Sequence, residues 1–152
     1  MTLFTGMNTT ASALTAQRLR MDVISSNMAN VDTTRGKMVD GEWQPYQRKS
    51  VVMVPKGNQF SSFLNKAMNT RDGHTAGGVQ VSRIEEDEQT PFKLVYDPEH
   101  PDANDEGYVS LPNVDPLREM VDLISATRSY EANVTVFNAN KAMLMKSLEI
   151  GK

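Results

Sequence analysis

The sequence predicts an α+β protein in which two long terminal helices pair as a coiled coil and enclose a small inserted β-rich lobe. Both ends of the chain carry apolar residues that repeat every seven positions, whereas the middle carries short β-branched and alternating runs. The 152 residues are 39% hydrophobic and 7% aromatic, which is little for a single globular core. We therefore expect a helical domain at 1-36 and 113-152, with the lobe at 37-112.

The C-terminal helix is expected from Pro116 to about Ile150. Asp115 is a good N-cap, Pro116 suits the first helical position, and Gly151 follows the last apolar residue. At about 1.5 Å per residue the helix is roughly 50 Å long, more than a small domain can cover. Its predicted seam is a seven-residue row with companions four residues on: Leu123, Tyr130, Phe137 and Leu144, with Thr127, Val134 and Leu148.

The N-terminal helix is expected from Thr2 to about Asn30 and carries a matching row. That row is Met7, Leu14, Met21 and Met28, flanked by Leu3, Ala11 and Ile24. A strict seven-residue row favours a helix–helix seam over the broad apolar face of a globular helix. The alternative, that both rows are the core of an ordinary helical domain, stays open.

The segment from Asn30 to Gly36 is expected to end the first helix. Apart from Val31 and Arg35 it consists of Asn, Asp, Thr and Gly residues; the polar side chains can bond nearby backbone groups, and Gly allows unusual backbone angles. We expect Gly36 to have a positive φ and to set the direction in which the chain leaves the helix.

Three strands are expected in the middle of the chain. The first ends at Val51–Val54 before Pro55, and the others cover 77–84 and 91–96. The acidic run Glu85–Glu88 is predicted to be a hairpin turn between the second and third strands. Residues 56–76 fit a short helix or a long mobile loop equally well, and residues 97–109 read as a proline-stiffened connector.

Composition argues against several function classes. The net charge is −3 and no basic patch alternates with aromatic residues, so neither nucleic acid nor an anionic membrane is an expected partner. There is no cysteine, which excludes disulfides and thiolate sites. The N-terminus lacks the features of a cleaved signal peptide, and no apolar run is long enough to span a membrane.

No catalytic, cofactor or metal site is expected either. His74 and His100 lie in polar stretches without a second ligand at suitable spacing, and we expect both to be solvated. The run from Asp102 to Gly107 imitates the start of a calcium loop, but the position that requires a bidentate carboxylate is Asn113. No constellation indicates an enzyme or a small-molecule substrate.

Several stretches of the chain resemble a known family. The end of the first helix resembles the signature of the flagellar rod, hook and hook-associated axial proteins through Ser26, Asn27, Ala29, Asn30, Asp32, Thr33 and Gly36. The connector at 97–109, Pro112-Asn113-Val114 and the helix at 119–134 are most similar to the proteins of the proximal rod.

This resemblance implies a structural subunit of the bacterial flagellum, located in the basal-body rod that crosses the periplasm and cell wall. It implies export by the flagellar type III apparatus without a cleaved signal peptide, and assembly with copies of itself and other rod proteins into a helical tube that transmits torque. The paired helices would form the inner layer and line the channel. A soluble helical-hairpin adaptor that binds a partner helix is the alternative.

Overall fold

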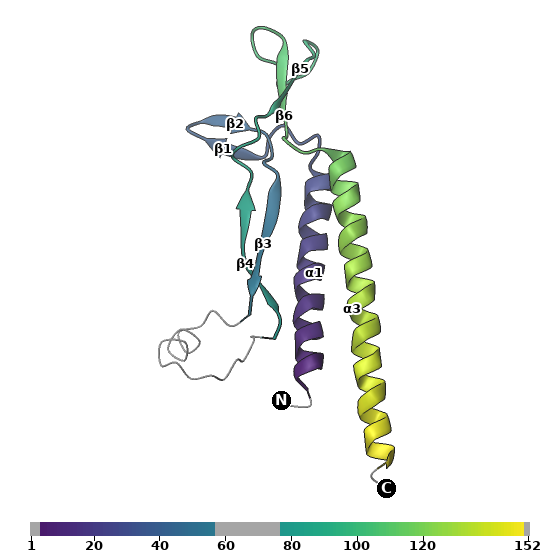
Figure 1. The fold of residues 1–152 in the computed structure, drawn as a ribbon. Helices are drawn as coiled ribbons and strands as arrows, with labels where there is room; N and C mark the ends of the chain where they lie inside the picture. The colour runs from purple at the N-terminus through teal and green to yellow at the C-terminus, as the bar shows by residue number, and fades with distance from the viewer. Residues whose placement is uncertain (1–3, 57–76, 151–152) are drawn as a thin grey trace, which may run out of the picture. The chain divides into compact units, whose positions relative to one another are not determined.

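The computed structural model describes residues 4–56 and 77–150, apart from the side chain of Ile150. Two long helices, α1 (Thr5–Ala29) and α3 (Pro116–Ile150), enclose the strands in sequence, in an α+β arrangement (Figure 1). Between them lie six short strands: β1 (Lys37–Val39), β2 (Glu42–Gln44), β3 (Lys49–Pro55), β4 (Val79–Glu86), β5 (Lys93–Tyr96) and β6 (Tyr108–Leu111). The predicted α+β class and both helices are confirmed.

The start of α3 follows the capping signal in the sequence. The Asp115 carboxylate accepts the N–H of Leu117 at 3.1 Å, and the Asp115 carbonyl accepts the N–H of Glu119 at 3.0 Å. The first bond satisfies one of the donors that the first turn of a helix leaves without intrahelical partners, and the second is the first intrahelical bond, accepted by the N-cap carbonyl.

The strands pair differently from the prediction. In the described part of the chain they form three two-stranded sheets, β1–β2, β3–β4 and β5–β6. The predicted hairpin between 77–84 and 91–96 is therefore wrong, and Glu85 and Glu86 belong to β4. Beyond β4, Asp87 instead accepts bonds from Gln89 N–H and from Thr90, so the acidic run makes a local turn without joining two paired strands.

Two strand pairs were not expected. In β1–β2, Lys37 faces Gln44 across a turn at Asp40 and Gly41, whose φ angles are 52° and 90°. In β5–β6, Tyr96 faces Tyr108, and the two rings meet edge to face with centroids 5.3 Å apart. The connector predicted at 97–109 is thus mostly the loop of a hairpin, with its end in β6.

The chain divides into two compact units, described here separately. Unit 1 comprises Met1–Leu19, Val52–Arg83 and Ala126–Lys152; unit 2 comprises Arg20–Val51 and Ile84–Ser125. In unit 1, Ala16 and Ala126 are buried between the secondary-structure elements. In unit 2, the buried apolar residues are Val23, Ile24, Val109 and Val114. The predicted domain boundaries stay a prediction.

Helices α1 and α3 approach each other closely inside each unit. In unit 1 a Cβ atom placed on Gly6 would lie 3.3 Å from Asn140 Nδ2. In unit 2 the Arg20 guanidinium lies 3.4 Å from the Asp122 carboxylate. No helix in the described residues is both long and apolar enough to cross a bilayer.

Candidate functional site

Unit 2 contains a group of polar side chains that we call the polar junction: Asn27, Tyr46, Arg48, Lys49, Asn113 and Glu119. Two of them, Asn27 and Glu119, are 0% exposed. Burial of this kind is costly unless every polar atom has a partner. The bonds of the junction therefore explain why α1, β3 and α3 meet as they do in this unit.

Asn27 pairs with the backbone of β3 through both ends of its amide. Its Nδ2 donates to the carbonyl of Lys49 at 2.8 Å, and its Oδ1 accepts the N–H of Lys49 at 2.9 Å. The hydroxyl of Tyr46 also donates to Asn27 Oδ1, at 3.0 Å. An amide is the one kind of neutral side chain that can donate and accept in this way, so Asn27 fixes the start of β3 against α1.

Glu119, in the first turns of α3, accepts a bond on each carboxylate oxygen. Arg48 Nε donates to Oε1 at 2.6 Å, and Asn27 Nδ2 donates to Oε2 at 3.0 Å. Arg48 also lies 3.5 Å from Asp122, and its own side chain is only 15% exposed. This buried, charge-assisted network ties three segments that are distant in sequence.

Asn113 links the entry of α3 to β3 and to the turn after β4. Its Oδ1 accepts the N–H of Arg48 at 2.7 Å, while Nδ2 donates to the carbonyls of Asp87 and Thr90. Asn113 was expected to fail as a calcium ligand, and its side chain is instead used for these structural bonds.

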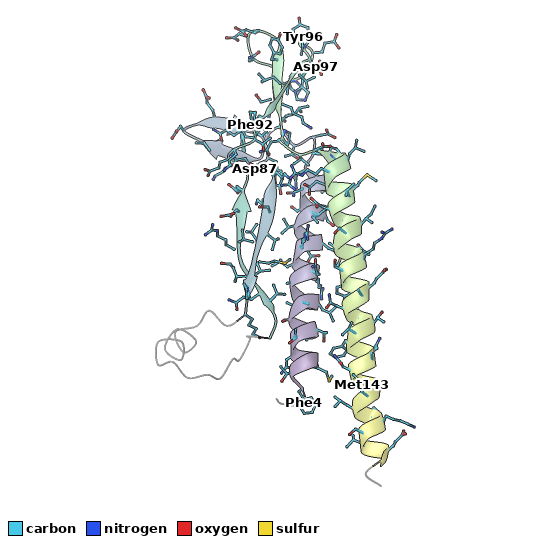
Figure 2. The ribbon with its side chains drawn as sticks, viewed as in Figure 1. Phe4, Asp87, Phe92, Tyr96, Asp97 and Met143 are labelled. Atoms are coloured by element: carbon cyan, nitrogen blue, oxygen red, sulfur yellow. The ribbon has the colours of Figure 1, made fainter. Side chains whose placement is uncertain are left out.

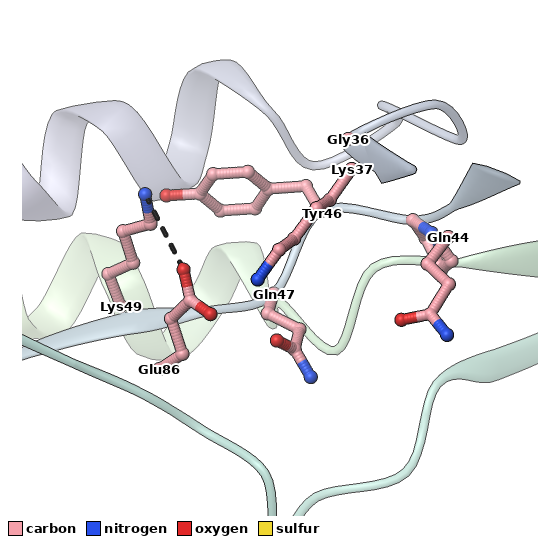
Figure 3. Close-up of a pocket in the computed structure, with 8 residues that line it drawn as sticks. Gly36, Lys37, Gln44, Tyr46, Gln47, Lys49 and Glu86 are labelled. Carbon is pink, nitrogen blue, oxygen red and sulfur yellow. Dashed lines mark ion pairs between the residues drawn. The ribbon is translucent and has the colours of Figure 1, made fainter. Parts of the chain in front are cut away.

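Lys49 and Tyr46 also line a shallow polar pocket (Figure 3). The Lys49 ammonium lies 3.9 Å from the Glu86 carboxylate and 5.6 Å from the centroid of the Tyr46 ring. Both Lys49 and Glu86 are partly exposed, so this ion pair contributes little to stability compared with the buried bonds.

The turn after α1 is held by the residues of the sequence signature. Asn30 donates from Nδ2 to the carbonyl of Ser26 and accepts the hydroxyl of Thr33. The N–H of Tyr46 then donates to the carbonyl of Thr33 at 3.1 Å. Asn30 and Thr33 of the signature therefore hold the path from α1 into the strands of unit 2.

Gly36 contributes to this path for a different reason from the one expected. It is absent from the glycines with positive φ, which are Gly41, Gly78 and Gly107 in the described chain. A Cβ atom on Gly36 would lie 2.6 Å from the backbone nitrogen of Tyr46, which is far too close. Gly36 is thus required by the close approach of two backbone segments, and the predicted positive φ is wrong.

The loop between β5 and β6 is attached to the same turn. Asp102 accepts bonds from Thr34 Oγ1 at 2.7 Å and Arg35 Nε at 2.8 Å. The bonds from Arg35 and then Thr34 hold the pKa of the Asp102 carboxyl below its usual value. Likewise, bonds from Thr90 lower the pKa of Asp87.

The calcium-like run and His100 make other contacts in the described part of the chain. Asn104 Oδ1 accepts the N–H groups of Glu106 and Tyr108, and no group of three or more His, Cys, Asp or Glu side chains is placed to hold a metal within the described residues. His100 is half-buried and its Nδ1 accepts the N–H of Asp102, so the expectation of a fully solvated side chain is wrong. His74 and residues 57–76 lie outside the described residues.

The predicted seam residues are mostly half-buried within the chain. Ile24 is buried, whereas Leu148 is 72% exposed. The other nine are half-buried: Met7, Leu14, Met21, Met28, Leu123, Tyr130, Val134, Phe137 and Leu144. Among the signature residues, Asn27 is buried, Asn30 and Thr33 are half-buried, and Ser26, Ala29, Asp32 and Gly36 are exposed. Sequence reasoning missed Arg48 and Glu119 as partners, because nothing local connects two charges that lie 71 positions apart.

Comparison with known proteins gives consistent results at both ends of the chain. The family model "Flagella basal body rod protein" matches residues 7–36, and "Flagellar basal body rod FlgEFG protein C-terminal" matches residues 105–150. Together these matches contain three of the six residues of the polar junction, namely Asn27, Asn113 and Glu119.

Curated relatives match over the whole chain. The flagellar basal-body rod protein FlgC of Bacillus subtilis is 64% identical, with 100% of both chains covered. FlgC of Borreliella burgdorferi is 45% identical over 99% of this chain and 98% of the relative, and FlgC of Salmonella typhimurium is 43% identical over 93% and 92%. Identity at this level over full length establishes the family, and the chain therefore belongs to the FlgC family of flagellar basal-body rod proteins.

Proposed function

We propose that this chain builds the rod by pairing α1 with α3 along their seven-residue rows and by packing the paired helices against neighbouring subunits. As a member of the FlgC family, the chain is a structural component of the flagellar basal-body rod and not an enzyme. The proposal concerns how it performs that role: in the proximal part of the rod, with copies of itself and other rod proteins, as a helical tube that transmits torque.

The spacing of the less exposed positions on α3 supports the pairing. They include a series at intervals of three and four, namely Glu119, Leu123, Ala126, Tyr130, Asn133, Phe137, Asn140 and Leu144, and three positions beside it, Asp122, Ser129 and Val134. This is the spacing of a coiled-coil seam, and it contains the predicted row of Leu123, Tyr130, Phe137 and Leu144. Of the predicted companions, Val134 is half-buried, whereas Thr127 and Leu148 are exposed.

The observation that carries the assembly proposal is a second apolar face on α3. Leu117, Val121 and Ile124 lie three and four residues apart, so they share one side of the helix, and Leu117 and Val121 are 74% and 67% exposed. A soluble monomer rarely exposes such a contiguous apolar stripe on a regular helix. A helix with one apolar face against its own chain and another left uncovered is suited to lie between subunits.

With these helices packed against neighbours, the tube would have them as its inner, channel-lining layer and the β segments outside. Head-to-tail contacts between identical subunits produce open helical assemblies when the rotation between subunits does not close into a ring, and a rod requires this geometry. The proposal includes export of the chain by the flagellar type III apparatus without cleavage of a signal peptide. Membership in a family of rod components argues against the adaptor alternative.

Substitution of Val121 by Gln tests the proposal. The side chain is mostly exposed in the single chain, so the variant should fold normally but should lose the contact with its neighbour. In cells lacking the wild-type gene, we expect normal protein levels and export but incomplete rods and no swimming. The matched control is Arg128→Gln, at an exposed position of the same helix, which should swim. Normal rods and swimming with Val121→Gln would overturn the proposal.

A further inference from the structure

The loop between β5 and β6, residues 97–107, begins with two consecutive turns. The N–H of His100 donates to the carbonyl of Asp97 at 3.3 Å, and the N–H of Ala103 donates to the carbonyl of His100 at 3.1 Å. A proline occupies the second position of each turn, where its fixed φ suits a β-turn. Figure 2 labels Asp97 at the start of the loop, directly after β5. His100 therefore belongs to both turns.

His100 stands at the first position of the second turn, where Asn, Asp and Ser are the usual residues. The side chains of Asn and Asp accept the N–H group two residues further along the chain. In this loop the imidazole does the same, since Nδ1 of His100 accepts the N–H of Asp102 at 3.1 Å. A ring nitrogen that accepts a hydrogen bond carries no proton, so this bond requires the neutral imidazole.

The carboxylate of Asp102 attaches the loop to the turn after α1. It accepts bonds from Thr34 Oγ1 at 2.7 Å and from Arg35 Nε at 2.8 Å. The backbone N–H of Asp102 thus binds His100 while its side chain binds the turn after α1. The bond to His100 therefore helps to hold the carboxylate in the position from which it reaches Thr34 and Arg35.

We propose that protonation of His100 releases loop 97–107 from the turn after α1, so that the position of this loop depends on pH. The imidazolium has an N–H group at both ring positions and no acceptor, so its Nδ1–H faces the N–H of Asp102, donor against donor. Histidine is the side chain whose charge ordinarily changes between pH 5 and 8. Since the detached loop binds the proton more readily than the attached loop does, attachment weakens as pH falls.

The charges around His100 favour detachment once the ring is protonated. They are the carboxylates of Asp97, Glu99 and Asp102 on its own loop and the guanidinium of Arg35 on the turn after α1. The carboxylates attract an imidazolium, whereas Arg35 repels it, and the imidazolium competes with Arg35 for Asp102. Because the bonds from Arg35 and then Thr34 lower the pKa of Asp102, its carboxylate stays ionised between pH 5 and 8.

Trp43, the only tryptophan of the sequence, lies where the loop attaches. It lines a pocket of about 260 Å³ together with Thr34 and Arg35 of the turn and with Asp102 and Ala103 of the loop. Departure of the loop removes one wall of this pocket and changes the surroundings of the indole ring. The fluorescence of Trp43 therefore reports on attachment without an added label.

Two measurements on the purified full chain, at about pH 7.5 and about pH 5.5, test the inference. Hydrogen exchange measured by NMR gives the protection of the Ala103 amide relative to an unstructured peptide at the same pH. The emission spectrum of Trp43 gives the state of the pocket. We expect the protection of Ala103 to fall roughly fivefold at the lower pH, the size expected for the loss of one hydrogen bond, and the emission to change with the same midpoint.

His100→Asn is the decisive variant, because the side-chain oxygen of asparagine accepts the same N–H and does not titrate. It should keep the Ala103 protection and the Trp43 emission of the neutral state at both pH values. His100→Ala has no acceptor and should show reduced protection at both. His74→Gln removes the other histidine of the sequence and should respond to pH as the unchanged chain does.

Protection that is independent of pH in the unchanged chain, or that falls equally in His100→Asn, would overturn the inference. Loss of the Ala103 protection without a change in the Trp43 emission would also overturn it, because the turn would then open while the loop stays attached. So would a pH response that disappears in His74→Gln. None of these outcomes affects the proposed function, which Val121→Gln tests separately.

Discussion

Replacement of Glu119 by Gln tests the polar junction with almost no change of shape. The carboxylate accepts one bond on each oxygen, from Arg48 Nε at 2.6 Å and from Asn27 Nδ2 at 3.0 Å. Glutamine has a single oxygen, so its NH₂ group must face one of these two donors. The variant therefore loses a charge-assisted bond and leaves a buried donor unsatisfied.

The expected cost follows from the burial of the pair. Removal of one partner of a buried ion pair typically costs 3–5 kcal/mol. Because Arg48 keeps a second carboxylate, that of Asp122 at 3.5 Å, we expect a loss of stability at the lower end of this range. We expect the free energy of unfolding to fall by about 3 kcal/mol, equivalent to a decrease in Tm of roughly 6–12 °C for a chain of this length.

Urea unfolding of the purified chain at pH 7, followed by far-UV circular dichroism, measures this change. Glu131→Gln is the control, because Glu131 lies on the same helix and is exposed, and its effect should stay within about 0.5 kcal/mol. If Glu119→Gln unfolds at the same urea concentration as the control, the buried network does not hold unit 2 together.

Three further predictions concern the turn after α1, its attached loop and the seam. In the same assay, Gly36→Ala should lower the free energy of unfolding by about 2–3 kcal/mol, and Gly41→Ala, whose φ is positive but whose Cβ meets nothing within 4 Å, should lower it by about 1 kcal/mol. The reverse order would show that a positive φ costs more than the close backbone approach at Gly36. The pKa of Asp102 is lowered in the folded chain, so the stability that its carboxylate contributes is present above the ordinary value of 3.8 and is lost as pH falls through the folded-state pKa. Between pH 6 and pH 2, the free energy of unfolding should therefore fall less steeply for Asp102→Asn than for the unchanged chain, and equal slopes would refute this. Phe137→Ala should weaken the assembled rod by about 3 kcal/mol if neighbouring subunits complete the burial of its side chain, and cells that carry it should have incomplete rods. Cells that carry Asn138→Ala, at the exposed position next to it, should swim, and equal motility of the two strains would count against the seam.

The helices were predictable because their signals are local. Asp115 and Pro116 mark the start of α3, and the turn residues from Asn30 onward follow the end of α1 at Ala29. Strands β3 and β4 were also close to their predicted positions, because β-branched runs bounded by Pro and Gly indicate strands without reference to the rest of the chain.

The strand partners were not predictable in the same way. The acidic run after β4 looked like a hairpin turn, but β4 pairs with β3, which precedes it by more than twenty residues. One pairing signal was present and missed: Asp40-Gly41 between two short strands is typical of a tight hairpin with positive φ at both turn residues.

The sequence indicates some residues of the polar junction and its surroundings locally, whereas others become apparent only in the fold. Asn27 and Asn30 stand out in the sequence because they belong to the signature after α1. Their partners do not: Arg48 and Glu119 read as ordinary exposed charges, and only the fold brings them together with Asn27. Buried polar networks of this kind follow from tertiary structure, which local pattern and composition do not contain.

A density map of the assembled rod, with each chain traced, tests the pairing of α1 and α3 most directly. We predict that the two helices lie side by side in the layer nearest the axis, with Leu117 and Val121 of α3 against a neighbouring subunit and the β segments outside. A rod in which the β segments line the channel, or in which α1 and α3 of one chain are separated, would contradict this arrangement.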